Sequence, residues 1–133
     1  MRIWIASGLP VLAVMAACAS NDMPDVAEGA TLFANNCTAC HGYRGTGSER
    51  LINGEPAPDL TRISARNGGV FPSARVLSQI DGYGRGKVDS AVMPEFGALL
   101  EGDLVPVDIE DTLTPTPRPL AALLVYLKSI QVR

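Results

Sequence analysis

The chain has 133 residues, of which 47% are hydrophobic, 19% charged and 5% aromatic, and this size and composition fit one folded domain and exclude two. Eleven basic residues stand against fourteen acidic ones, a net charge of −3, so the chain lacks the basic excess that nucleic-acid binding requires. Thirteen glycines and ten prolines predict long structured loops between few helices.

The first residues are typical of an export signal. Arg2 precedes an apolar stretch from residue 3 to residue 17, which matches the positive and apolar regions of a signal peptide. This stretch is shorter than the roughly 20 residues of a membrane-spanning helix and contains Pro10, so a retained transmembrane anchor is the weaker interpretation. One cleavage site is the A-x-A motif Ala17-Cys18-Ala19, which would release a soluble exported protein.

The other cleavage site resembles a bacterial lipobox. In Met15-Ala16-Ala17-Cys18, small residues precede a cysteine that becomes lipidated and forms the new N-terminus. The resemblance implies a signal peptide over 1–17, a lipid on Cys18, a tether over 18–23 and a folded domain over 24–133. We therefore expect the protein at the periplasmic side of a bacterial membrane, held by lipid, or in the soluble periplasm.

Residues 25–36 are predicted to form an amphipathic helix. Pro24 suits its first turn, and the carboxylate of Asp25 suits its positive end. Inward positions recur at intervals of three and four, at Val26, Gly29 with Ala30, Phe33 and Cys37.

This helix continues into Cys37-Thr38-Ala39-Cys40-His41, the C-x-x-C-H pattern of covalent c-type haem attachment. Residues three apart lie on one face of a helix, so the thiols of Cys37 and Cys40 can reach the two vinyl groups of one porphyrin edge. His41 follows as the proximal iron ligand. The sequence thus predicts one covalently bound haem c.

Two other interpretations of the motif are weaker. A thiol oxidoreductase usually combines C-x-x-C with a βαβ pattern, whereas the flanks of this motif are predicted to be helical. A structural zinc site needs about four ligands, and His41 is the chain's single histidine, so the motif supplies only three.

After the motif, residues 42–72 are expected to be mostly loop. A short helix is predicted over 73–80, with Ser73 as its cap, Gly82 after its end, and Val76, Leu77 and Ile80 facing inward. Another short helix is expected within 95–103, and the prolines of 112–119 predict a stiff entry to a final helix over 119–131. The apolar stripe of that helix comprises Leu120, Leu123, Leu124, Leu127 and Ile130.

The glycine-rich run 82–86 has some likeness to a phosphate-binding loop. It lacks the Gly-Lys-Ser/Thr of a P-loop and follows a helix where a P-loop follows a strand. A flexible surface turn is the favoured interpretation.

The sixth iron ligand is predicted to be a methionine, because a chain with one histidine cannot supply two and a thioether is a soft donor. Once the signal is removed, Met23 and Met93 remain. Met23 lies in the tether, whereas Met93 lies in a loop stiffened by Pro94, which favours Met93. A core-filling Met93 and a five-coordinate haem are the alternatives.

The motif and its surroundings resemble the class I cytochrome c family over about residues 24–133. The segments that carry the resemblance, besides the haem motif, are Glu28-Gly29-Ala30-Thr31-Leu32-Phe33, Ala57-Pro58-Asp59-Leu60, Met93-Pro94 and 120–129 with Tyr126. The resemblance implies an all-α cytochrome c fold, with three to four helices and long loops around one haem. It also implies that the first helix meets the last at close range.

The resemblance further assigns residues around the haem. The Pro58 carbonyl is expected to accept a hydrogen bond from the imidazole of His41. The tryptophan that often binds a haem propionate in the family is absent from the predicted domain, and Tyr83 or Arg85 could replace it.

A haem closed by histidine and methionine has no open position, so its expected reaction is outer-sphere transfer of one electron. The chain is accordingly predicted to be an electron carrier, with redox proteins as partners, in a bacterial respiratory or periplasmic chain. A cytochrome subunit of a periplasmic oxidoreductase complex is the alternative, and a gas-sensing haem is a third hypothesis.

Charge is unevenly distributed along the sequence. Residues 44–87 carry seven basic and four acidic residues, whereas 95–111 carry six acidic residues and no basic one. Such a dipole could steer docking, and the alternative is two solvated faces with no partner.

Overall fold

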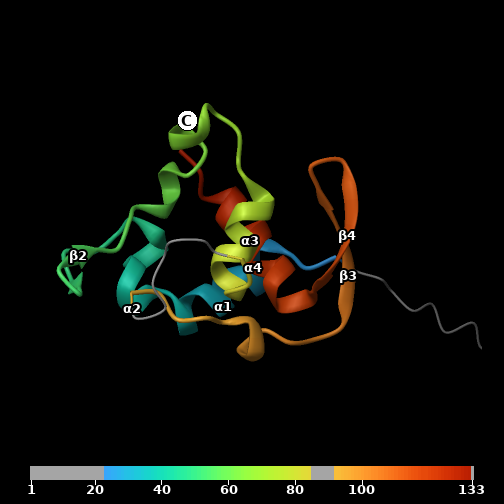
Figure 1. The fold of residues 1–133 in the computed structure, drawn as a ribbon, viewed down its shortest axis with the longest axis horizontal. Helices are drawn as coiled ribbons and strands as arrows, with labels where there is room; N and C mark the ends of the chain where they lie inside the picture. The colour runs from blue at the N-terminus through green and yellow to red at the C-terminus, as the bar shows by residue number, and fades with distance from the viewer. Residues whose placement is uncertain (1–22, 85–91, 133) are drawn as a thin grey trace, which may run out of the picture.

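The computed structural model describes residues 23–84 and 92–132 (Figure 1). Its helices are α1 (Val26–Asn36), α2 (Thr38–His41), α3 (Ser73–Asp81) and α4 (Arg118–Ser129). Its strands form two antiparallel hairpins, β1 (Leu51–Ile52) with β2 (Glu55–Pro56) and β3 (Leu104–Ile109) with β4 (Thr112–Pro117). Short 3₁₀ turns lie at Tyr43–Gly45, Leu60–Arg62, Ala65–Asn67 and Gly97–Leu99. The predictions for the signal peptide, Cys18 and Arg85 fall outside the described residues.

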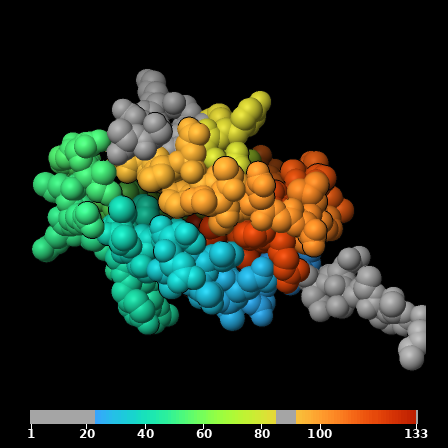
Figure 2. Space-filling view, turned by 90° about the horizontal axis from the view of Figure 1, so that it is seen from below, coloured from blue at the N-terminus to red at the C-terminus, as the bar shows by residue number. Residues whose placement is uncertain are grey.

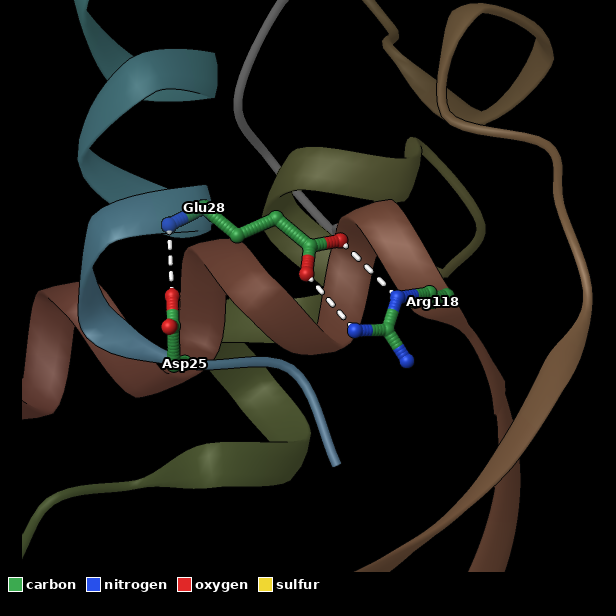
Figure 3. Close-up of polar contacts among 3 residues, drawn as sticks. All are labelled: Asp25, Glu28 and Arg118. Atoms are coloured by element: carbon green, nitrogen blue, oxygen red, sulfur yellow. Dashed lines mark hydrogen bonds and ion pairs between the residues drawn. The ribbon is translucent and has the colours of Figure 1, made fainter. Parts of the chain in front are cut away.

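The first helix begins at a side-chain cap. Oδ1 of Asp25 accepts a hydrogen bond from the backbone N–H of Glu28 at 2.8 Å (Figure 3), which satisfies one of the free donors of the first turn. Pro24 therefore precedes the cap and does not lie in the first turn. Gly29 and Phe33 are buried as predicted, but the inward position assigned to Val26 is wrong, because this residue is 45% exposed.

Helices α1 and α4 pack closely, as the resemblance implied. The Phe33 and Tyr126 rings lie with centroids 5.1 Å apart in a tilted arrangement, which aromatic pairs favour. Arg118, at the start of α4, forms two hydrogen bonds to the Glu28 carboxylate, Nη2 to Oε2 at 2.9 Å and Nε to Oε1 at 3.1 Å (Figure 3). This two-point contact fixes the relative position of the two helices and also stabilises their packing.

The final helix forms the centre of the core. Its residues Leu120, Leu123, Leu124 and Leu127 are buried, as their spacing predicts. In the space-filling view α4 is visible only between α1 and the segment after residue 92 (Figure 2). Beyond the helix, Nε2 of Gln131 donates to the Leu60 carbonyl at 2.8 Å, which joins the C-terminal end to the loop before α3. Among the described residues, no helix combines the length and apolarity that crossing a membrane requires.

The expectation of an all-α fold is wrong for residues 51–56 and 104–117, which contain strands, although the helices expected over 25–36, 73–80 and 119–131 are confirmed. The proline-rich segment expected as a stiff entry to α4 is strand β4, paired with β3 in a register that sets Val107 opposite Thr114. Glu110 and Asp111 form the turn with φ of 52° and 65°, the positive values that a two-residue type I′ turn needs. Tertiary pairing here outweighs the low strand propensity of proline.

The boundaries of α3 and of the region after it also differ from expectation. Helix α3 starts after Pro72 without a side-chain cap, so Ser73 lies inside the helix. Gly82 ends it with φ of 100°, the left-handed conformation predicted for a C-terminal glycine. Only the 3₁₀ turn Gly97–Leu99 occupies the segment 95–103, where a short helix was expected.

Candidate functional site

The two thiols and the imidazole are brought together by the junction of α1 and α2. The N–H of Cys37 donates to the Phe33 carbonyl at 2.9 Å, and the N–H of His41 donates to the Cys37 carbonyl at 2.9 Å. The helical hydrogen-bond pattern thus continues through the motif, although Cys37 itself separates α1 from α2 with φ of −119°. Cys37 and Cys40 are free thiols, not joined to each other. Helical spacing thus places both thiols and His41 along one cavity wall.

The chain after the motif folds back over α2. Gly42 adopts φ of 73°, and a Cβ there would overlap the Gly47 carbonyl oxygen, so this position needs glycine. The N–H of Gly47 donates to the His41 carbonyl at 2.8 Å, and Oγ of Ser48 donates to the Cys40 carbonyl at 2.7 Å. These bonds satisfy carbonyls at the end of α2 and hold the motif in place.

The His41 ring is oriented by the backbone of Pro58. Nδ1 lies 3.3 Å from the Pro58 carbonyl oxygen, and because a carbonyl can only accept, Nδ1 carries the hydrogen. The lone pair of Nε2 is then the one available to a metal. Burial lowers the pKa of His41 below its ordinary value, while the bond to Pro58 acts in the opposite direction. The imidazole is therefore neutral at pH 7, as metal ligation requires.

Asp59 fixes the loop that presents this carbonyl. Its Oδ1 accepts hydrogen bonds from Oγ1 of Thr61 at 2.6 Å and from the Thr61 N–H at 2.9 Å. The hydroxyl bond is the main cause of a lowered pKa for Asp59, and the nearby Arg62 and Arg66 contribute in the same direction. The carboxylate is thus ionised at neutral pH and caps the 3₁₀ turn Leu60–Arg62.

A cavity of about 370 Å³ opens beside the motif. One wall holds Cys37, Cys40 and His41. The remaining walls are mostly apolar and come from α1, the loop before α3, α3, the segment after residue 92 and α4: Phe33, Pro58, Leu60, Ile63, Val76, Ile80, Phe96, Leu123 and Leu127. This is a volume and lining typical of sites for organic cofactors.

Met93 lines the same cavity, 52 positions after His41 in the chain. Nε2 of Gln79 on α3 donates to the Met93 sulfur at 3.5 Å. The N–H of Phe96 donates to the Ile80 carbonyl at 2.9 Å, which holds the segment after Met93 against the end of α3. The His41 imidazole and the Met93 thioether, the two iron ligands predicted from the sequence, therefore line the same cavity.

These groups fit a covalently bound haem. Two free thiols, one neutral imidazole and one thioether surround an apolar space, which is the donor set of c-type attachment with axial histidine and methionine. Burial, together with the neighbouring Cys40 thiol, raises the pKa of Cys37 to about 11, whereas thiol-exchange catalysts lower it. Within residues 23–84 and 92–132, no three His, Cys, Asp or Glu side chains form a separate metal cluster.

Other predicted residues lie elsewhere. Tyr83 is 84% exposed and does not line the cavity, so the structure does not bring it to the motif, and its contact with a propionate stays a prediction. Met23, which precedes α1, is exposed and also absent from the lining. Sequence reasoning missed Gln79, although its spacing of three from the inward Val76 places it on the same face of α3.

Comparison with known proteins gives two findings. The family model described as Cytochrome c matches residues 26–113. The cbb3-type cytochrome c oxidase subunit CcoP of Cereibacter sphaeroides is 40% identical over 79 residues, which are 59% of this chain and 23% of the relative. The chain thus spans less than a quarter of the length of this relative. No solved structure matches the chain.

Proposed function

The chain belongs to the cytochrome c family, and from that premise we propose that it transfers single electrons through a haem closed on both sides by His41 and Met93. Family membership implies one haem c, covalently bound, and electron transfer as its role. The shared cavity of His41 and Met93 carries the ligation proposal. A closed iron favours outer-sphere transfer over binding of a substrate.

In this proposal each group has a separate task. Cys37 and Cys40 would attach the cofactor, and His41 would bind its iron through Nε2 while its Nδ1–H donates a hydrogen bond to the Pro58 carbonyl. The bound haem supplies an iron that alternates between two oxidation states. Met93 would provide the second protein ligand, with Gln79 donating a hydrogen bond to its sulfur.

The apolar lining performs the second part of the function. Side chains such as Phe33, Leu123 and Leu127 give the cavity an apolar lining, so little solvent would reorganise around a haem held there when an electron arrives or leaves. A soft thioether and a low dielectric both favour the reduced state. The expected reduction potential is accordingly higher than that of a haem with water or hydroxide in place of Met93.

Denaturing electrophoresis followed by a haem peroxidase stain tests covalent attachment. Protein matured by a c-type assembly system should keep its haem on the polypeptide, whereas Cys37→Ala with Cys40→Ala should lose it. Cys18→Ser is the matched control, because it removes a cysteine outside the motif and should stain like the wild type. Absence of stain from the mature wild-type protein would contradict the proposal.

The proposed setting is the periplasmic side of a bacterial membrane. The lipobox-like sequence around Cys18 supports anchoring by lipid, with redox proteins as donor and acceptor. Cleavage after Ala19, giving a soluble periplasmic protein, is the alternative.

A second candidate function is that of a subunit in an oxidoreductase complex. The likeness to an oxidase subunit over 79 residues favours it. Gentle solubilisation followed by size-exclusion chromatography separates the two candidates. A subunit should elute with an oxidase activity at high mass, whereas a free carrier should elute without that activity, as a single mature chain with its haem and any bound detergent.

A further inference from the structure

The β3–β4 hairpin has two chemically different faces. On its inner face Val107 and Thr116 are buried, and Val105 and Ile109 pack against the core. Directly opposite residues of an antiparallel pair lie on the same face. The register therefore assigns the outer face to three pairs, Leu104 with Pro117, Pro106 with Pro115, and Asp108 with Leu113.

This outer face is made of those six residues, of which five are apolar and one, Asp108, is acidic. Leu104 is 65% exposed and Leu113 71% exposed, and the exposed prolines Pro106 and Pro115 lie between them along the strands. Because these two leucines are exposed, they add little to the stability of the protein's own core. Clusters of exposed apolar residues of this kind mark interaction surfaces.

The chain segment that leads into the hairpin and forms it carries charge of one sign. Between residues 92 and 117 the chain carries six acidic residues and no basic one: Glu95, Glu101, Asp103, Asp108, Glu110 and Asp111. Asp108 lies on the face itself, and Glu110 with Asp111 forms the turn at its end. The next basic side chain, Arg118, is occupied by Glu28.

The outer face is also remote from the haem cavity. No residue of 104–117 lines the cavity, and α2 and the hairpin lie at opposite ends of the molecule (Figures 1 and 2). A partner docked here would leave the cavity end of the domain accessible.

We propose that the outer face of the β3–β4 hairpin docks a protein partner that presents an apolar patch ringed by lysine or arginine. Complementary charge supports this occupant. A bilayer surface with anionic lipids, or a second copy of this chain, would bring like charges against Asp108 and the acidic turn. The proposal goes beyond electron transfer and does not depend on which residues ligate the iron.

The hairpin's backbone favours docking on the face over addition of a strand to its edge. In a hairpin with a two-residue type I′ turn, the residue pair next to the turn is hydrogen-bonded, and non-hydrogen-bonded and hydrogen-bonded pairs alternate from there. Pro106, Pro115 and Pro117 therefore belong to non-hydrogen-bonded pairs. The N–H at such a position points away from the ladder, and proline lacks it. The outer edge of β4 thereby loses two of its donors for an added strand.

Site-specific photo-cross-linking in the organism that encodes the chain tests this proposal. A photoreactive amino acid replaces Leu113 in the full-length protein, and mass spectrometry maps the adduct. The matched control carries the same group at Val70, which is 70% exposed in another part of the fold. We expect position 113 to give an adduct with one other protein, on an apolar residue flanked by basic side chains, and position 70 not to give it.

Second-site changes show whether the face itself is responsible. Leu104→Ser or Asp108→Lys in the position-113 protein should lower the adduct yield roughly tenfold, whereas Leu51→Ser, at an exposed leucine of β1, should leave it unchanged. The thermal unfolding midpoint and the haem absorption spectrum should stay the same in all three, which separates loss of docking from loss of the fold or of the haem function. Adducts with lipid, with a second copy, with residues 1–22 of the same chain, or with no molecule would each overturn the proposal.

Discussion

Gly29 in α1 lies directly against the backbone carbonyl of Ala122 in α4. A Cβ at position 29 would overlap that carbonyl oxygen and lie 2.6 Å from Cβ of Tyr126. The crossing of the two helices therefore depends on a missing side chain. The same crossing positions Phe33 and Leu123, which line the cavity, so the helix contact and the cofactor site are coupled.

Gly29→Ala should lower the free energy of unfolding by roughly 1–3 kcal/mol, because backbone atoms must separate to admit the methyl group. At an open helical position the same change would stabilise by about 1 kcal/mol. Guanidinium denaturation followed by circular dichroism measures the difference. Ala34→Val, at an exposed position of the same helix, is the control and should change stability by no more than roughly 0.5 kcal/mol. A Gly29→Ala protein more stable than the wild type would contradict the contact.

The parts of the fold that sequence predicted were those with local signals. Apolar residues that recur every three to four positions identified α1 and α4. The haem motif identified Cys37 and His41, which lie in the cavity wall. The left-handed glycine at position 82 also has a purely local cause. Such features depend on near neighbours in the chain and hence appear in a single sequence.

The β3–β4 hairpin was missed for a physical reason. Val105, Val107 and Ile109 alternate with other residues, as do Thr112, Thr114 and Thr116, and this β-branched alternation is typical of strands. The prolines in both segments argued against a strand, since proline is rare inside strands. Only the register, a property of the two strands together and not of either segment alone, places each proline where no ladder hydrogen bond is lost. Gln79 was missed similarly, because its contact with Met93 joins two distant segments.

Met93→Ala should produce three changes together: loss of the charge-transfer band of methionine ligation in the oxidised spectrum, a lower reduction potential, and new binding of carbon monoxide. Water or hydroxide would replace the thioether and favour the ferric state. Potentiometry with visible spectroscopy measures all three. An unchanged spectrum and potential would show that another residue is the ligand.

Gln79→Leu should act more weakly in the same direction. A hydrogen bond to the Met93 sulfur withdraws electron density from it, so its loss should lower the potential by tens of millivolts, where 59 mV corresponds to a tenfold change for one electron. Ser78→Ala, a neighbouring change on α3 outside the cavity lining, is the control. Equal reduction potentials in the Gln79→Leu protein and the wild type would show that the hydrogen bond from Gln79 to the Met93 sulfur does not influence the haem.

The interaction between Asp59 and Thr61 should depend on pH. The pKa of Asp59 is lower in the folded state than its ordinary value of 3.8, so its contribution is complete above that value and is lost as pH falls through the folded pKa. A double-mutant cycle with Asp59→Asn and Thr61→Val measures the coupling. We expect about 1 kcal/mol at pH 6, at the low end for a charged hydrogen bond because solvent reaches the carboxylate. A coupling that persists undiminished at pH 2 would contradict this account.

Cys18→Ser should release the protein from the membrane. If Cys18 carries lipid, its diacyl anchor plus an acylated terminus resist washing with high salt, whereas the variant should appear in the soluble periplasmic fraction. The intact mass of the mature protein provides the second measurement. Wild-type protein that is soluble and begins at Ser20 would instead support cleavage at the A-x-A site.

A redox titration of the mature protein, followed by visible spectroscopy with and without carbon monoxide, tests the central claim most directly. A haem closed by His41 and Met93 should show one transition with the slope of a single electron and the same midpoint in both atmospheres. Carbon monoxide binds ferrous iron, so an open or easily opened position would raise the midpoint by mass action. A single-electron transition that carbon monoxide does not move is the predicted result, and a midpoint that rises under carbon monoxide would contradict it.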